Sequence, residues 1–180
     1  MLLDKSDFLN WGFGEVLENR TRGILAEYIV AKSLDALSEK RIEWDYCDLR
    51  YRGVEIEVKS AAYVQSWEQK RPSTIGFEIG TRRWKWAHET NDMVEVAPAA
   101  RLANIYVFCL LDILDRKQAA PLDTAQWRFF VAPTATINQH LGTQKRAGLA
   151  SIQRIAEACD FGALRAVVDG FVDQHPAAPL

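Results

Sequence analysis

Asp48, Glu57 and Lys59 have the types and the spacing expected of a metal-dependent phosphodiesterase site. Residues two apart on a strand share a face, so Glu57 and Lys59 point to one side and Ile56 and Val58 to the other. Carboxylate oxygens are the ligands that Mg²⁺ prefers. A lysine beside the metal can orient the attacking water, polarise it, or stabilise the charge that develops on phosphorus, and the sequence leaves these tasks open.

A β-hairpin must hold these residues together. The Arg52-Gly53 pair predicts a reversal, because glycine tolerates a positive φ, and a second strand then runs through Lys59. Pairing the two strands with their apolar faces together places Asp48 beside the charged residues of the second strand. Asp45 has the opposite parity and is the second choice as acidic partner, if the strand is regular back to that residue. A solvated sheet face with cross-strand ion pairs has the same alternation, so the motif depends on its surroundings.

A helix is expected from Arg22 to about Leu37, with apolar residues on nearly every side, so it should be largely buried. At 100° per residue, Glu27 lies on an apolar face of this helix. An ionised carboxylate in that position needs a partner or a metal. The alternative is that its stem packs while its head reaches water or Arg20.

Taken together, these residues resemble the motifs of the PD-(D/E)xK nuclease superfamily, which has the restriction-endonuclease-like fold. The resemblance covers roughly residues 20–67 and rests on Gly23-x-x-Ala26-Glu27, Asp48 and Glu57-x-Lys59. It implies that Asp48 and Glu57 bind Mg²⁺, with Mn²⁺ as a substitute. It also implies that Lys59 acts on water and that Glu27 assists at the metal.

Two details around this motif carry less weight. Cys47 stands where the superfamily usually has a proline before the acidic residue, which leaves the choice between Asp45 and Asp48 open. Downstream, an aromatic and a glutamine follow the lysine, as in several nuclease branches, and they would share its face if the strand persists. The resemblance therefore implies substrate-binding roles for Ser60, Tyr63 and Gln65.

The remaining elements predict an α/β fold, restriction-endonuclease-like, with a central mixed β-sheet flanked by helices. Strands are expected at Thr74 to Gly80, Ile105 to Leu111 and Trp127 to Ala132, the middle one being buried on both sides. Helices are expected from about Leu149 to Ala158, with Ser151 as a start signal, and from about Gly162 to Val172. The segment Arg82 to Leu102 is expected to be a loop with some helix.

The length of 180 residues predicts one nuclease-like domain, with a core at about 20–135, C-terminal helices at about 149–172 and a frayed tail at 175–180. The longest apolar strand run has only seven residues against the roughly 18 that a membrane span needs, and the acidic N-terminus does not resemble a secretory leader. Three scattered cysteines without C-x-x-C indicate neither a disulfide framework nor a zinc cluster and fit a reducing cytoplasm. The three histidines, His88, His140 and His175, are expected at the surface.

Net charge argues mildly against nucleic acid as a partner. Lys and Arg total 22 against 24 for Asp and Glu, which gives −2, whereas nucleic-acid binders are often basic. Local clusters could still contact phosphates, or they could be solvated faces. These clusters are Lys70-Arg71, Arg82-Arg83-Lys85 and Lys145-Arg146.

The leading hypothesis is an Mg²⁺-dependent nuclease, a DNA endonuclease of restriction, defence or repair that leaves a 3′-hydroxyl, as the resemblance implies. The alternative is a catalytically inactive module of the same fold that binds DNA or a partner protein. A weaker option is an ion-pair-rich structural protein of unrelated fold. Because one small active site cuts one strand, a homodimer or a partner protein is also expected.

Overall fold

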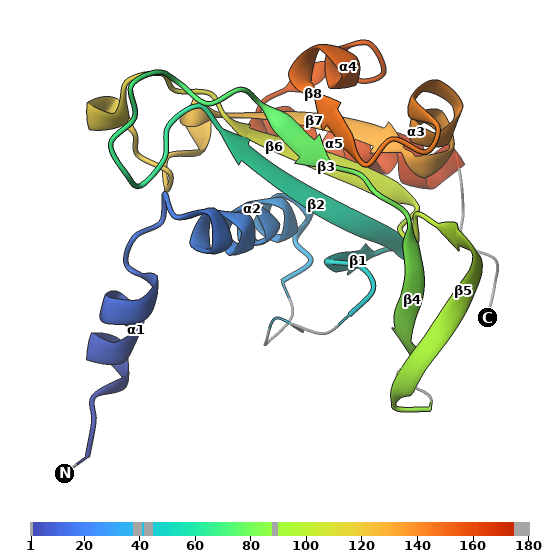
Figure 1. Ribbon diagram of the computed structural model, residues 1–180, viewed down its shortest axis with the longest axis horizontal. Coiled ribbons are helices and arrows are strands. Elements are labelled where there is room, and N and C mark those ends of the chain that lie inside the picture. The colour runs from blue at the N-terminus through green and yellow to red at the C-terminus, as the bar shows by residue number, and fades with distance from the viewer. Residues whose placement is uncertain (1, 38–40, 42–44, 88–89, 175–180) are drawn as a thin grey trace.

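The computed structural model describes residues 2–37, 41, 45–87 and 90–174. The chain folds around a five-stranded sheet in the order β1-β2-β6-β7-β9 (Figure 1). Its strands are β1 (Leu49–Tyr51), β2 (Val54–Ala62), β6 (Ile105–Leu111), β7 (Trp127–Pro133) and β9 (Ala158–Cys159). β2 and β6 are parallel and all other neighbours are antiparallel, so the predicted α/β class with a mixed central sheet is confirmed.

Helices cover both faces of this sheet. On one face α2 (Asn19–Leu34) packs against the even-numbered residues of β2, and α5 (Phe161–Gln174) packs against β7 and β9. On the other face α3 (Thr134–Leu141), α4 (Leu149–Gln153) and a ribbon of β3 (Gly76–Glu78) with β8 (Arg146–Gly148) pack against the alternate residues of β6. Every residue of β6 is buried, as its continuous apolar run predicts.

The β1–β2 hairpin turns where the sequence predicts. Arg52 and Gly53 both have positive φ, at 50° and 78°, which suits the right-handed twist of a two-residue hairpin. The strand is not regular back to Asp45, however, because β1 begins only at Leu49 and the chain bends just before it. Cys47 packs on the α3 side of the sheet and Leu49 on the α2 side, so the two-residue alternation is broken between them.

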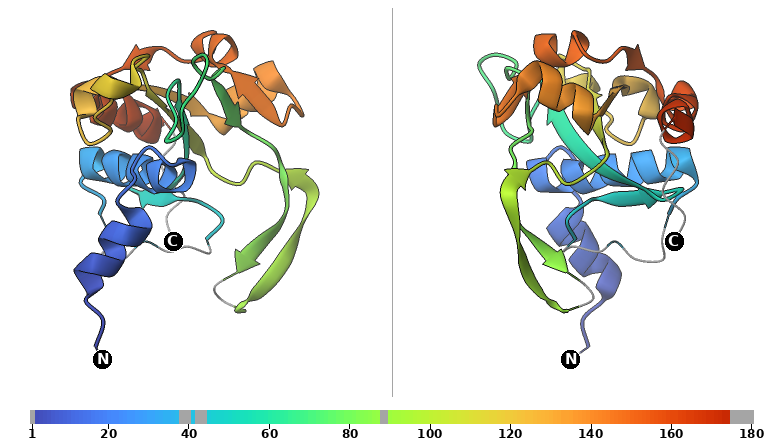
Figure 2. Two further views of the ribbon diagram at one scale, coloured as in Figure 1. Left: turned by 60° about the vertical axis from the view of Figure 1, so that its left-hand side comes forward. Right: turned by 90° about the vertical axis from the view of Figure 1, so that its right-hand side faces the viewer.

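The segment Arg82 to Leu102 is not a loop with some helix. It forms a second hairpin of β4 (Arg82–Ala87) and β5 (Asp92–Ala100), which projects from the body of the molecule (Figure 2). Trp84 lies opposite Glu95 and Trp86 opposite Met93, and such cross-strand pairs stabilise an exposed ribbon without burying either face.

Three further expectations need correction. The strand at 74–80 is only Gly76–Glu78 and pairs with β8 outside the central sheet. The helix expected to reach Ala158 ends at Gln153, because the chain must return to the sheet edge, where Ala158 pairs with Phe130. Helix α2 ends at Leu34 rather than Leu37, since Asp35 takes a left-handed conformation with φ 55°.

Other parts of the chain have no counterpart among the predicted elements. Helix α1 (Lys5–Phe13) buries none of its residues and stands away from the sheet (Figure 1). Short 3-10 turns occur at η1 (Arg116–Gln118) and η2 (Thr124–Gln126). None of the helices among the described residues is both long enough and apolar enough to cross a membrane. The expected tail at 175–180, with His175, and the expected surface residue His88 lie outside the described residues.

Candidate active site

Glu57 is a buried carboxylate shared by two cations. It is 3% exposed, and its Oε1 accepts hydrogen bonds from Lys59 Nζ at 2.5 Å and from Arg82 Nη2 at 2.8 Å. The side chains of Lys59 and Arg82 are 25% and 46% exposed, so both cationic heads remain open to a ligand. A buried carboxylate needs such partners. Here β2 supplies Lys59, and the start of β4 supplies Arg82.

Asp48 lies beside Glu57 at the edge of β2. Its backbone N–H donates to Ile56 O at 3.0 Å, and its Oδ2 accepts from Val58 N–H at 2.7 Å. Burial raises the pKa of Asp48 to about 6, with a further rise from the charge of Glu57 and an opposing effect from Lys59. The three residues with predicted chemistry are therefore neighbours, and the two carboxylates repel each other.

Glu27 approaches Asp48 from helix α2, which packs on the even-numbered face of β2, whereas Glu57 and Lys59 lie on the odd-numbered face and do not line its cavity. Glu27 forms a two-point ion pair with Arg41, through Nε to Oε2 at 2.5 Å and Nη2 to Oε1 at 2.9 Å. It lines a cavity of about 480 Å³ together with Asp48, and its charge adds a small rise to the pKa of Asp48. The sequence leaves water, Arg20 or a metal as its partner, whereas the structure shows Arg41.

Asp45 lines the same cavity but is differently placed. Its side chain is 3% exposed and pairs with Arg50 through two hydrogen bonds, of 2.5 and 3.0 Å. Within the described part of the chain, Asp48 forms no ion pair. The carboxylate of Asp48 is thus the more available of the two, and the choice of Asp48 over Asp45 as the metal ligand stays a prediction.

The residues that follow Lys59 divide between the two faces of the sheet. Ser60 Oγ and Gln65 Oε1 both accept from the buried guanidinium of Arg22, at 3.3 and 3.4 Å, on the α2 side. The expectation that Gln65 shares the face of Lys59 fails because β2 ends at Ala62 and the alternation stops there. Tyr63 does pack on the predicted face.

Sequence reasoning missed Arg82 and Tyr106 as neighbours of the carboxylates. Tyr106 is aligned with Glu57 across the parallel β2–β6 pair. Its pKa is raised to about 12, mainly by burial and then by the charge of Glu57. The available signals were a phenol within the otherwise apolar run of β6 and the position of Arg82 at the start of a basic cluster.

The donor set suits a hard cation with few protein ligands. Among the described residues, no three Asp, Glu, His or Cys side chains are close enough together to hold a metal ion. Mg²⁺ commonly takes one or two carboxylates and completes its shell with water and phosphate oxygens. Glu57 is buried and Asp48 is half-buried, and these two carboxylates, which repel each other, fit that requirement, whereas Glu27 would first have to leave Arg41.

Comparison with known proteins identifies the class of enzyme. Residues 13–145 match the family model described as bacteriophage T4 endonuclease IV. The matched span contains Glu27, Asp48, Glu57 and Lys59 together with the β4–β5 hairpin. No curated protein matches the chain. An endonuclease family implies a nucleic acid as substrate, and the match covers well over half of the sequence, so this chain belongs to the bacteriophage T4 endonuclease IV family of nucleases.

Proposed function

We propose that this protein is an Mg²⁺-dependent DNA endonuclease with its catalytic centre at Asp48, Glu57 and Lys59. The observation that carries the proposal is the buried carboxylate of Glu57, with half-buried Asp48 beside it and Lys59 in contact with it, within a chain of an endonuclease family. Membership of the PD-(D/E)xK superfamily, with its restriction-endonuclease-like fold, is part of the same proposal. It is supported by the hairpin position of the motif and by the mixed sheet behind it.

Asp48 and Glu57 would hold the metal, and Mn²⁺ would serve in place of Mg²⁺. A bound divalent ion supplies Lewis-acid stabilisation of the charge on the scissile phosphate. Lys59 Nζ, held against Glu57 and open to solvent, orients the attacking water. The water oxygen would bond to phosphorus and give up a proton to solvent, the bond from phosphorus to the 3′ oxygen would break, and that oxygen would take a proton from solvent to become a 3′-hydroxyl.

Arg82 and Glu27 have supporting roles in this proposal. Arg82 comes from outside the central sheet and contacts the same oxygen of Glu57 as Lys59 does, so its half-exposed guanidinium is available to a phosphate oxygen. Glu27 assists from the α2 side, where its charge also bears on Asp48. Its ion pair with Arg41 compensates that charge until substrate and metal are bound.

Nicking of supercoiled plasmid tests the proposal. The wild-type protein should nick DNA with Mg²⁺ and stop when the metal is chelated. Lys59→Ala should lose about 10²- to 10⁴-fold in rate, the usual contribution of a group that handles a proton. Lys32→Ala, which removes an exposed lysine of α2 that does not line the cavity of Glu27 and Asp48, is the control. Equal nicking by the wild-type protein and Lys59→Ala would mean contamination and a wrong assignment of Lys59.

The biological setting is also part of the proposal. A homodimer, or a partner protein, would let one small centre act on both strands, and sedimentation velocity of the protein with and without DNA measures this. Restriction, defence and repair are the roles that we propose. A cytoplasmic location fits three free thiols, two of them buried, because reducing conditions keep cysteines unpaired.

A further inference from the structure

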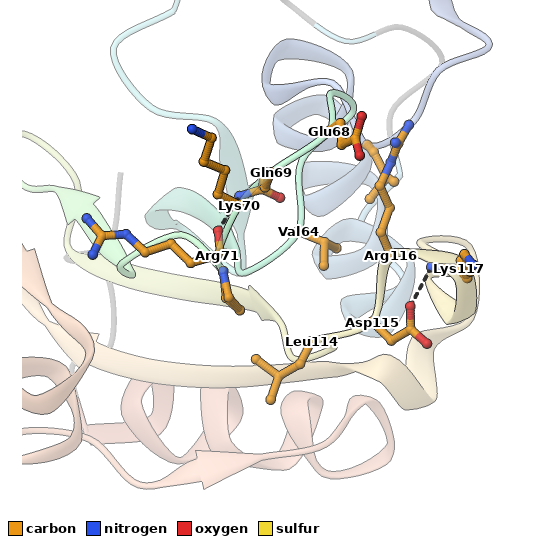
Figure 3. A pocket seen from close by; sticks show the side chains of 11 residues that line it. Val64, Glu68, Gln69, Lys70, Arg71, Leu114, Asp115, Arg116 and Lys117 are labelled. Carbon is orange, nitrogen blue, oxygen red and sulfur yellow. Dashed lines mark hydrogen bonds between the residues drawn. The ribbon is translucent and has the colours of Figure 1, made fainter.

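A second feature of the molecule suits a phosphate-rich ligand. A groove of about 620 Å³ lies beyond the carboxyl ends of the parallel strands β2 and β6 (Figure 3). One wall is the segment 68–72 with Val64, and the other is the segment 114–117, with Leu17 beside them. Ligands of α/β proteins commonly bind beyond the carboxyl ends of parallel strands.

Positive charge predominates along this groove. It is lined by four cations, Lys70, Arg71, Arg116 and Lys117, and by two carboxylates, Glu68 and Asp115. All four cations are exposed, and within the described residues none forms an ion pair. Asp115 already accepts a hydrogen bond from the backbone N–H of Lys117 at 2.9 Å. The whole chain has a net charge of −2, so the groove is a local concentration of positive charge on a slightly acidic protein.

The cations are spread along both walls instead of meeting at one point. Figure 3 shows the side chains of Lys70 and Arg71 on one wall, and Arg116 and Lys117 on the other. A single phosphate would need converging donors, whereas an extended backbone of repeating phosphates suits this distribution. Trp67, which is 54% exposed, precedes the first wall and adds an aromatic surface near the groove.

The walls are already held in shape. Arg116 Nη2 donates to Ser66 O at 2.6 Å and so ties one wall to the chain that precedes the other. Gln69 accepts from the backbone N–H of Gln65 at 2.7 Å and donates to Ser73 Oγ at 2.9 Å. These hydrogen bonds fix the loop after β2, so binding requires little new order.

The groove lies along β2 from the candidate active site. Lys59 and Val64 are five positions apart, so at ~3.3 Å per residue the groove begins at most about 16 Å from Lys59. One strand of B-form DNA places a phosphate about every 3.4 Å of helix axis, so this distance along the axis corresponds to at most about five nucleotides. We propose that the groove between residues 64–72 and 114–117 binds the backbone phosphates of the strand being cut, within about five nucleotides of the scissile bond. This inference rests on the proposed function.

Salt-dependent binding tests the groove. The double variant Lys70→Ala/Lys117→Ala removes one cation from each wall, and neither side chain makes a hydrogen bond among the described residues, so the fold should persist. The matched control is Lys32→Ala/Arg165→Ala, which removes the same charge from the α2 and α5 side. Binding of a labelled oligonucleotide is measured in a chelator, so that no cleavage occurs, from about 0.05 to 0.3 M salt.

The groove variant should reduce the slope of log affinity against log salt by about 1.8 on duplex DNA, or about 1.4 on a single strand. Its affinity at 0.1 M salt should fall about 10- to 100-fold, and the control should match the wild type. The wild-type affinity should also rise as the oligonucleotide lengthens past about five nucleotides, while the groove variant gains less.

The outcomes separate this inference from the proposed function. If the wild-type protein nicks DNA, Lys59→Ala does not, and the groove variant keeps the wild-type slope and affinity, then the groove inference is overturned and the function stands. A fall of equal size in the control variant would also overturn it, because the effect would then be one of net charge. If the wild-type protein neither binds nor cuts nucleic acid, the proposed function fails and the groove inference fails with it.

Discussion

Replacing Asp48 with asparagine should stabilise the metal-free protein while it removes activity. In the folded protein burial and the charge of Glu57 raise the pKa of Asp48 from 3.8 to about 6. Between these two values the folded chain binds the proton more tightly than the unfolded chain does, so stability falls as the pH rises through this window. Above pH 6 the whole penalty is present, and asparagine, which carries no charge, removes it.

The size of the effect follows from the shift. About two pKa units correspond to about 3 kcal/mol of unfolding free energy, at roughly 1.4 kcal/mol per unit. The asparagine Oδ1 can still accept from Val58 N–H, so the hydrogen bond at 2.7 Å is kept. The asparagine amide also brings two N–H donors, which offset part of the gain. We therefore expect the unfolding free energy to rise by about 1 to 3 kcal/mol at pH 7.5 and by less than about 0.5 kcal/mol at pH 4.

Urea unfolding at both pH values, in the presence of a chelator, measures this gain. Asp112→Asn, which changes an exposed carboxylate just beyond β6, is the control and should change the stability by no more than about 0.5 kcal/mol. The reasoning is refuted if Asp48→Asn is less stable than the wild type at pH 7.5, or if the difference is the same at pH 4.

Three further outcomes are expected. At subsaturating Mg²⁺ the nicking rate should rise about tenfold per pH unit below pH 6 and level off above it, since Asp48 must be ionised to bind a cation. A nicking rate that is flat from pH 5 to 7 would contradict this. Arg82→Ala should lower the nicking rate about 10- to 100-fold, with partial recovery in Arg82→Lys, whereas equal rates would remove Arg82 from the centre. Arg22→Ala should lower the unfolding free energy, measured in urea, by about 3 kcal/mol, because Leu17 O and Ser60 Oγ lose their buried donor. A loss below about 0.5 kcal/mol would show that Arg22 does not support the fold.

Local sequence signals were enough for β1, β2, β6 and β7 of the central sheet, but not for β9, whose first residue was expected to be helical. β6 follows from a continuous apolar run, and the β1–β2 hairpin follows from Arg52 and Gly53, whose positive φ values match the predicted turn. The β4–β5 hairpin could not be recognised in the same way. It buries neither face, so its tryptophans alternate with charges without the contrast of a dry and a wet side, and its cross-strand pairs are visible only in three dimensions.

In the candidate site, too, some contacts follow from local strand pairing and others do not. The proximity of Asp48, Glu57 and Lys59 follows from pairing two adjacent strands, which strand parity can predict. The pairing of Glu27 with Arg41 and of Glu57 with Arg82 joins parts of the chain that no local pattern relates. The early end of α4 has a tertiary cause as well, since β9 pairs with β7 at the edge of the sheet.

Calorimetric titration of the protein with Mn²⁺, without nucleic acid, tests the central claim most directly. The wild type should bind the ion, and Asp48→Asn and Glu57→Gln should each weaken binding at least about tenfold, because each removes one of two carboxylate ligands. Lys59→Ala should still bind, since its ammonium is not a ligand. Affinity that is unchanged in both carboxylate variants would contradict a metal centre between Asp48 and Glu57.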